Sequence, residues 1–208
     1  RDNGSKKKER SSYTMSDKIG FKTKNVIRDT EGYYIIINES IQKQNITVVN
    51  IYAPNTGAPR HIKQIILELK REIDFNTIKA ADFNTSLSVL DRSSRQKINK
   101  ETSDLISTLE QMDLIYIYRR FHPMATEYTF FSSTHGSFSR IDHMLGYKTS
   151  LKTFRKIEIL SSIFSDHSWI KLGINNNRNF ENYINTMEIK QYGPEWSVSQ
   201  WRNQKETE

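Results

Sequence analysis

The sequence contains no cysteine and no long apolar segment, and both absences narrow the possible functions. Without cysteine there is no disulfide, no thiolate zinc site and no thiol nucleophile, so any chemistry must use oxygen and imidazole groups. No apolar run approaches the roughly 20 residues that cross a bilayer, and no apolar signal region follows the N-terminal RDNGSKKKER. We therefore expect an intracellular protein, in the nucleus or the cytoplasm, that has no membrane partner.

The chain is modest in hydrophobic residues and carries an excess of positive charge. Of its 208 residues 36% are hydrophobic, and 31 Lys and Arg against 24 Asp and Glu give a formal net charge of +7. The length favours one domain with a substantial core. The charge favours a polyanionic partner such as nucleic acid, but basic residues scattered over a solvated surface explain it equally well. Charge alone leaves both interpretations open, and nothing in the sequence predicts the oligomeric state.

Hydrophobic patterning divides the chain into three parts. We expect a basic, poorly ordered segment over residues 1–30, one ordered domain over residues 31–174, and a polar, disordered tail over residues 175–208.

Short strand patterns alternate with two helical patterns within the ordered part. Runs of β-branched and aromatic residues predict strands at 33–37, 46–52, 77–81, 128–132, 140–145, 157–163 and 169–174. Apolar residues at helical spacing predict one helix that begins near Pro59 and a second around Leu105. These patterns indicate an α/β protein and fit both a two-sheet sandwich flanked by helices and a doubly wound parallel sheet.

Acidic and amide residues recur just after predicted strands, in DFN at 82–84, RIDH at 140–143 and SDH at 165–167. The ends of strands in a rigid sheet can aim such side chains into one cleft. Carboxylates suit Mg²⁺, and a neighbouring imidazole can act as a base toward a water that attacks phosphorus. Taken singly, each group also fits an ordinary turn, a helix cap or a polar surface.

Five short motifs occur in order along the chain: VNIYAPN at 49–55, ADFNT at 81–85, YTFFS at 128–132, SRIDH at 139–143 and SDH at 165–167. Together they resemble the endonuclease domain of long interspersed nuclear element retrotransposon reverse transcriptases, within the endonuclease/exonuclease/phosphatase superfamily. The run DRSSRQKINKET at 91–102 resembles the retrotransposon branch in particular. The resemblance covers roughly residues 16–174. It implies a two-sheet β-sandwich flanked by helices, as in pancreatic deoxyribonuclease.

The resemblance assigns catalytic roles to five residues. It implies that Asp82 orients or deprotonates the attacking water, while Asn84 holds the scissile phosphate. Tyr52 would donate its hydroxyl to that phosphate, and His167 would lie against it. Asp142 would pair with His167 and fix its tautomer, so that the imidazole stabilises charge on the phosphorane.

Three further residues are implied to bind metal or DNA. Asp166 would help to hold Mg²⁺, with Mn²⁺ as a possible substitute, while Thr129 and Arg92 would contact the DNA strand. The family's domain begins with two strands that carry an Asn and a metal-binding Glu. We expect this chain to lack those first strands, to bind metal weakly and to be impaired as an enzyme.

The function implied is nicking of one strand of double-stranded DNA, which leaves a 3′ hydroxyl that primes reverse transcription. Partners would be double-stranded DNA and, through the parent polyprotein, element RNA. Two alternatives stay open: a non-catalytic basic relic that binds nucleic acid, and a phosphatase of the same superfamily.

Overall fold

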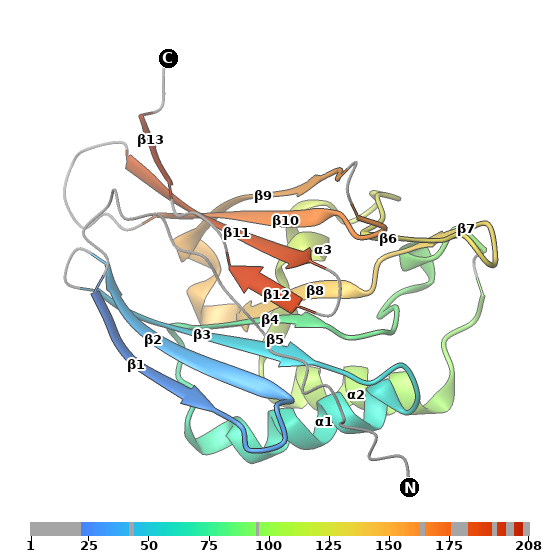
Figure 1. Ribbon diagram of the computed structural model, residues 1–208, viewed down its shortest axis with the longest axis horizontal. Helices are drawn as coiled ribbons and strands as arrows, with labels where there is room; N and C mark the ends of the chain where they lie inside the picture. The colour runs from blue at the N-terminus through green and yellow to red at the C-terminus, as the bar shows by residue number, and fades with distance from the viewer. Residues whose placement is uncertain are drawn as a thin grey trace, which may run out of the picture.

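The computed structural model describes residues 22–41, 44–94, 96–162, 165–175, 183–192, 195–198 and 202–205. In it a six-stranded sheet separates a pair of helices from a second sheet (Figure 1). The paired helices are α1 (Ala58–Glu68) and α2 (Lys100–Gln111). A third, short helix, α3 (Ile117–Phe121), contacts strands of both sheets. The molecule is therefore layered as helices, sheet and sheet.

The six-stranded sheet has the order β1-β2-β3-β4-β8-β5. Its strands are β1 (Lys22–Arg28), β2 (Tyr34–Ile41), β3 (Gln44–Tyr52), β4 (Thr77–Asp82), β8 (Asp142–Tyr147) and β5 (Leu114–Tyr116). Neighbouring strands are antiparallel except β3 and β4, which are parallel and are joined through α1. A parallel pair needs such a crossover, because a tight turn can join only antiparallel strands.

The second sheet has the order β12-β11-β10-β9, and β13 also pairs with β11. Its strands are β9 (Phe154–Leu160), β10 (Trp169–Asn175), β11 (Tyr183–Tyr192), β12 (Glu195–Val198) and β13 (Arg202–Lys205). A separate hairpin is formed by β6 (Phe130–Ser132) and β7 (Ser137–Ser139). Short 3₁₀ turns η1 (Leu69–Arg71), η2 (Val89–Asp91) and η3 (Lys148–Thr153) complete the fold.

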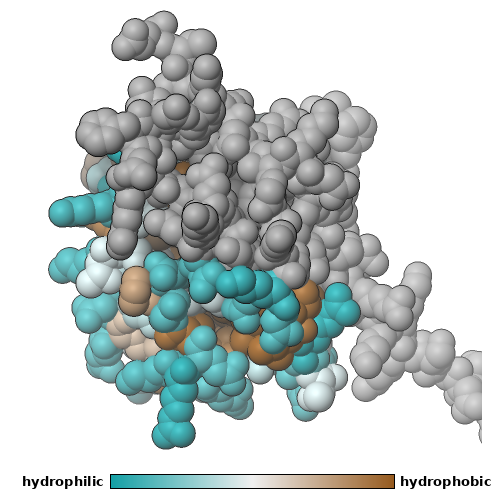
Figure 2. All heavy atoms as spheres, turned by 90° about the vertical axis from the view of Figure 1, so that its left-hand side faces the viewer, coloured by the Kyte–Doolittle hydropathy of each residue, from teal (hydrophilic) through white to brown (hydrophobic). Residues whose placement is uncertain are grey.

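Two hydrophobic cores lie on the two faces of the six-stranded sheet. Val49 of β3 packs with Ile62 of α1 and Leu105 of α2 on the helix side. Val48 of β3 packs with Leu172 of β10 on the side of the second sheet. Adjacent strand residues point to opposite faces, so one strand serves both cores. Away from the cores, the side of the molecule in Figure 2 is mostly hydrophilic where it is described, with hydrophobic residues gathered in smaller areas.

The expected α/β sandwich of two sheets flanked by helices is confirmed. The doubly wound alternative is wrong, because the six-stranded sheet contains a single parallel pair. None of the described helices is long and apolar enough to cross a membrane.

Strands also occur in two segments that we expected to lack order. β1 lies within residues 1–30, and β11, β12 and β13 lie within residues 175–208. These segments are polar, but strands pair through backbone groups, which a polar sequence supplies as well as an apolar one. Residues 1–21 and most of the tail outside these strands lie outside the described residues, and the division of the chain into domains stays a prediction.

Candidate active site

Three of the predicted residues meet at one end of the six-stranded sheet. Asp82 is the last residue of β4, and it lies directly across from Asp142, the first residue of β8. Tyr52 is the last residue of β3 and is the register partner of Asp82 on the other side. Register partners share a face of the sheet. Tyr52 packs against the core between the sheets, so all three side chains lie on the face toward the second sheet.

The imidazole of His167 reaches this strand end from the segment before β10. His167 forms an isolated bridge with Phe130 of β6, and their ring centroids are 4.8 Å apart. Its Nδ1 lies 2.9 Å from Asp142 Oδ2. A carboxylate can only accept, so Nδ1 donates and the tautomer is fixed. The predicted pairing of Asp142 with His167 is therefore present in the geometry, between the start of β8 and the segment before β10.

The Asp142–His167 pair is buried, and this shifts the proton affinity of the imidazole. Asp142 is 2% exposed and His167 is 9% exposed. Burial alone would lower the pKa of His167, but the hydrogen bond and charge of Asp142 raise it above its ordinary value. The charges of Asp82 and Asp166 act in the same direction. The arrangement therefore favours a protonated imidazole that can donate from Nε2 as well as from Nδ1.

Asp82 is the most strongly perturbed carboxyl group of the site. Burial and the neighbouring charge of Asp142 raise its pKa from 3.8 to about 7. The backbone N–H of Asn84 donates to Oδ1 at 2.9 Å and, together with the nearby His167, opposes this rise. A carboxyl group whose pKa lies near neutral pH is suited to accept and return a proton.

Asn84 joins the loop after β4 to the loop after β3. Its backbone is left-handed, with φ 45°, a conformation that asparagine tolerates better than most residues. Its Nδ2 donates to the carbonyl of Ala53 at 2.7 Å. The side chain is therefore held beside Asp82 and keeps one amide N–H for a ligand.

Thr129 is placed differently from our expectation. Its side chain has no exposed surface, and its Oγ1 accepts from the backbone N–H groups of Ile141 and Asp142, at 3.2 Å each. A side chain without exposed surface cannot touch a DNA strand, so the predicted DNA contact is corrected. The hydroxyl instead fixes the start of β8 and with it the backbone of Asp142.

Arg92 and Asp166 lie at the surface. Arg92 is half-buried, bridges Ser139 of β7 and donates from Nη1 to Gln96 Oε1 at 3.0 Å. Asp166 is exposed, and its carbonyl accepts from the N–H of Phe131 at 3.1 Å. Both residues adjoin the β6–β7 hairpin, where surface contacts are open to them.

Among the described residues, no group of three or more His, Asp or Glu side chains could hold a metal ion. The hard carboxylate oxygens of Asp166 are nevertheless of the kind that Mg²⁺ prefers. Magnesium keeps several waters and commonly uses one or two carboxylates together with phosphate oxygens. A magnesium ion at Asp166 would therefore have to take its other ligands from water and phosphate oxygens.

Sequence reasoning missed two features of the site. Phe131 and Phe138 face each other across the β6–β7 hairpin at 4.6 Å and are 39% and 49% exposed. Aromatic residues on both sides of STHG could have indicated such a hairpin. The second feature is a buried ion network around Asp91, Arg119 and Arg140, for which the sequence carries no local signal because the three residues are far apart.

Comparison with known proteins supports the same architecture. No family model matches the chain. It is similar in structure to the endonuclease domain of TRAS1, a telomere-specific non-LTR retrotransposon, with a TM-score of 0.60 and 15% identity over 74% of this chain and 70% of that one. For an AP endonuclease from Archaeoglobus fulgidus the TM-score is 0.57, with 16% identity over 71% of this chain and 69% of that chain. For the 3′ phosphatase NExo from Neisseria the TM-score is 0.60, with 15% identity over 74% of this chain and 72% of that chain. The chain thus has the endonuclease/exonuclease/phosphatase fold.

Proposed function

We propose that this protein is a phosphodiester hydrolase that nicks one strand of double-stranded DNA. The observation that carries the proposal is the buried Asp142–His167 pair, with Asp82 directly across from Asp142 on the neighbouring strand. A protonated imidazole beside a carboxyl group that titrates near neutral pH can serve a reaction that builds negative charge and releases a proton. The likeness to the TRAS1 endonuclease domain favours DNA as the substrate.

In the proposed reaction, Asp82 accepts a proton from water as the water oxygen attacks phosphorus in line with the leaving group. The P–O3′ bond breaks, the 3′ oxygen takes up a proton from solvent water, Asp82 returns its proton to the solvent, and the products are a 3′ hydroxyl and a 5′ phosphate. His167 donates from Nε2 to a phosphate oxygen, while Asp142 holds the ring through Nδ1. Asn84 and Tyr52 would bind the phosphate from the adjoining strand ends.

We propose Mg²⁺, or Mn²⁺ in its place, as the cofactor, with Asp166 as its protein ligand. Bound there, the cation would neutralise part of the phosphate charge. The exposed Asp166 directly precedes His167 in the chain, and this proximity supports the assignment. The other ligands would be water and phosphate oxygens.

A retrotransposon role is the most specific part of the proposal. The 3′ hydroxyl at a nick can prime reverse transcription, with element RNA as the template. The likeness to TRAS1, which is a retrotransposon protein, supports this role. It would place the protein with chromosomal DNA in the nucleus, or in the cytoplasm while bound to its RNA.

Two other functions have one supporting observation each. The likeness to the 3′ phosphatase NExo favours removal of phosphate from DNA ends by the same group of residues. The net charge of +7 favours binding to nucleic acid without hydrolysis. Binding alone would weaken steeply as salt rises and would not depend on Mg²⁺.

The test is a supercoiled-plasmid assay with Mg²⁺ or with EDTA. We expect relaxed circles only with Mg²⁺, and we expect a DNA polymerase to extend the nick without prior phosphatase treatment. A parallel sample with a 3′-phosphorylated oligonucleotide tests the phosphatase function through release of inorganic phosphate. If folded protein binds the plasmid in a salt-sensitive way but leaves it supercoiled, the nicking proposal is wrong.

A further inference from the structure

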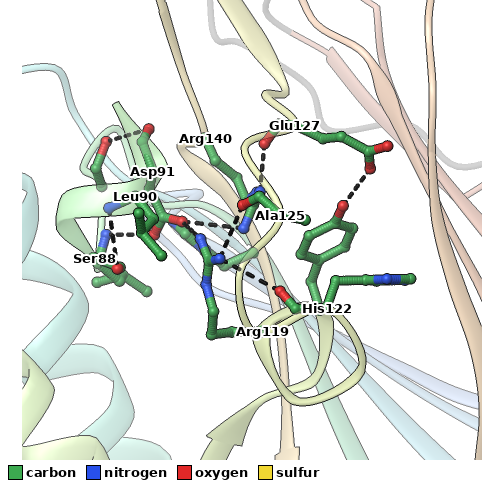
Figure 3. A network of polar contacts seen from close by, with 12 residues as sticks. Ser88, Leu90, Asp91, Arg119, His122, Ala125, Glu127 and Arg140 are labelled. Carbon is green, nitrogen blue, oxygen red and sulfur yellow. Dashed lines mark hydrogen bonds and ion pairs between the residues drawn. The ribbon is translucent and has the colours of Figure 1, made fainter. Parts of the chain in front are cut away.

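A buried ion network surrounds Asp91 and includes Arg140, two residues before Asp142, and we name it the Asp91 network (Figure 3). It consists of Asp91, Arg119, Arg140, Glu127 and Tyr118. Both guanidinium groups point at the carboxylate of Asp91, with Arg140 Nη1 at 3.0 Å from Oδ1 and Arg119 Nη2 in contact with the same oxygen. The other carboxylate oxygen of Asp91 accepts from the N–H of Leu87 at 3.2 Å.

The second half of the network holds Arg140 against the segment before the hairpin. Arg140 Nη2 donates to the carbonyl of Glu127, and its guanidinium lies 4.0 Å from the ring centre of Tyr118. The hydroxyl of Tyr118 donates to the carboxylate of Glu127. Arg119 donates to the carbonyls of Pro123 and Ala125 at 3.0 Å each. One network therefore ties together three parts of the chain, which are the turn at Asp91, residues 118–127 and Arg140.

This network acts on the backbone that carries Asp142. Arg140 is two residues before Asp142, and its N–H donates to the carbonyl of Asp91 at 2.7 Å. Glu127 is two residues before Thr129, whose hydroxyl accepts from the N–H groups of Ile141 and Asp142. The network therefore restrains both the donors and the acceptor of those two hydrogen bonds.

The central charged groups of the network are buried, and burial restrains their positions. Arg140 is 1% exposed and Asp91 is 3% exposed. Removal of one charge at this depth leaves the other without its charged partner. Two arginines share one carboxylate oxygen, and the remaining nitrogens of their planar guanidinium groups donate to backbone carbonyls, which restrains the segments that they join.

We propose that Asp91 is a positioning residue, which sets the orientation of Asp142 toward His167 through Arg140 and Thr129. The catalytic meaning of this inference rests on the proposed function, but the orientation itself can be measured without any activity. Arg92 follows Asp91 and bridges Ser139, which precedes Arg140. The same network therefore also sets the position of the proposed DNA contact at Arg92.

The test is NMR spectroscopy of the Asp91→Asn variant, which keeps the shape of the side chain but removes its charge. We expect loss of the downfield Nδ1 proton signal of His167, since that signal depends on the hydrogen bond to Asp142. We also expect hydrogen exchange at the amides of Ile141 and Asp142 to become about tenfold faster than in a control of equal melting temperature. Leu109→Ala in the helix-side core provides that control.

A second variant keeps the inference testable if Asp91→Asn does not fold. Arg140→Lys retains a cation for Asp91 but lacks the second amino group that reaches the Glu127 carbonyl. We expect the same loss of the His167 signal in this variant. If either folded variant keeps the signal and exchanges at the rate of Leu109→Ala, Asp91 serves stability alone and the inference is overturned. Because nuclease activity is not measured, a failed nicking assay would leave this outcome unaffected.

Discussion

A buried lysine on β4 gives the sharpest prediction at the scale of single residues. Lys79 is 1% exposed, its Nζ has no hydrogen-bond partner among the residues that the structure describes, and it lies 4.5 Å from the ring centre of Tyr147. Burial lowers its pKa from 10.5 to about 8. We expect Lys79→Met to raise the free energy of unfolding by roughly 2 to 3 kcal/mol at neutral pH, because methionine fills the space without a charge. Urea unfolding measures this change.

The same lysine predicts how stability depends on pH. Between about pH 8 and pH 10.5 the unfolded chain holds a proton on Lys79 that the folded protein has lost. Because the unfolded chain binds the extra proton, the contribution of Lys79 to the free energy of unfolding rises with pH in this window. The variant Lys79→Met should therefore exceed the natural protein in free energy of unfolding by less and less from pH 8 upward. All other groups titrate alike in the two proteins, so their effects cancel in this difference. A constant difference between the two proteins would contradict the assigned burial.

Single residues differ in how far the sequence could place them. The grouping of Asp82, Asp142 and His167 could be predicted because each follows or begins a strand within a recognisable motif. The burial of Thr129 could not, since a loop threonine gives no sign of which backbone N–H groups its hydroxyl accepts from. The ion pairs of Asp91 could not be predicted either, because its partners Arg119 and Arg140 come from distant segments.

At the scale of elements, length and periodicity decide what could be predicted. α1 and α2 each show an apolar stripe over several turns, and these stripes predict a helix that begins near Pro59 and a helix around Leu105, where the structure has them. The sequence does not predict β5 or α3, because elements of three and five residues are too short to show a repeat of apolar residues. β1 was missed because KTKNVIR is polar, as suits a strand at the edge of a sheet.

The packing of β8 against β9 supplies a prediction at this scale. A Cβ at Gly146 would lie 2.6 Å from Cζ of Phe154 and 3.3 Å from Cδ1 of Ile117. We expect Gly146→Ala to lower the free energy of unfolding by about 1 to 3 kcal/mol, because the aromatic ring must move within a filled core. Chemical unfolding tests this loss.

A double variant separates this clash from other effects of Gly146→Ala. Phe154→Leu shortens the side chain that a new Cβ would meet. The substitution Gly146→Ala should therefore lower the free energy of unfolding much less in the Phe154→Leu variant than in the natural protein. An equal loss of free energy of unfolding in the two proteins would show that the ring of Phe154 does not clash with the new Cβ.

At the scale of the whole molecule, two sheets are needed to assemble the site. β4 and β8 of the first sheet supply Asp82 and Asp142, and the segment leading into β10 of the second sheet supplies His167 (Figure 1). The resemblance of five motifs predicted this sandwich, but hydrophobic patterning left two architectures open. Hydrophobic patterning indicates which residues are buried, but it does not indicate which strands are neighbours in a sheet.

The measurement that tests the central claim most directly is the rate of plasmid nicking by His167→Ala beside that of His122→Ala. His122 is exposed, and its ring is bonded to the Ile157 carbonyl at 2.9 Å, so its loss removes an imidazole without touching Asp142. The account predicts that His167→Ala, in a sample that circular dichroism shows to be folded, nicks at least about 100-fold more slowly than the natural protein. His122→Ala should retain the full Mg²⁺-dependent rate. Equal nicking by both variants would contradict the assignment of the active site to the Asp142–His167 pair.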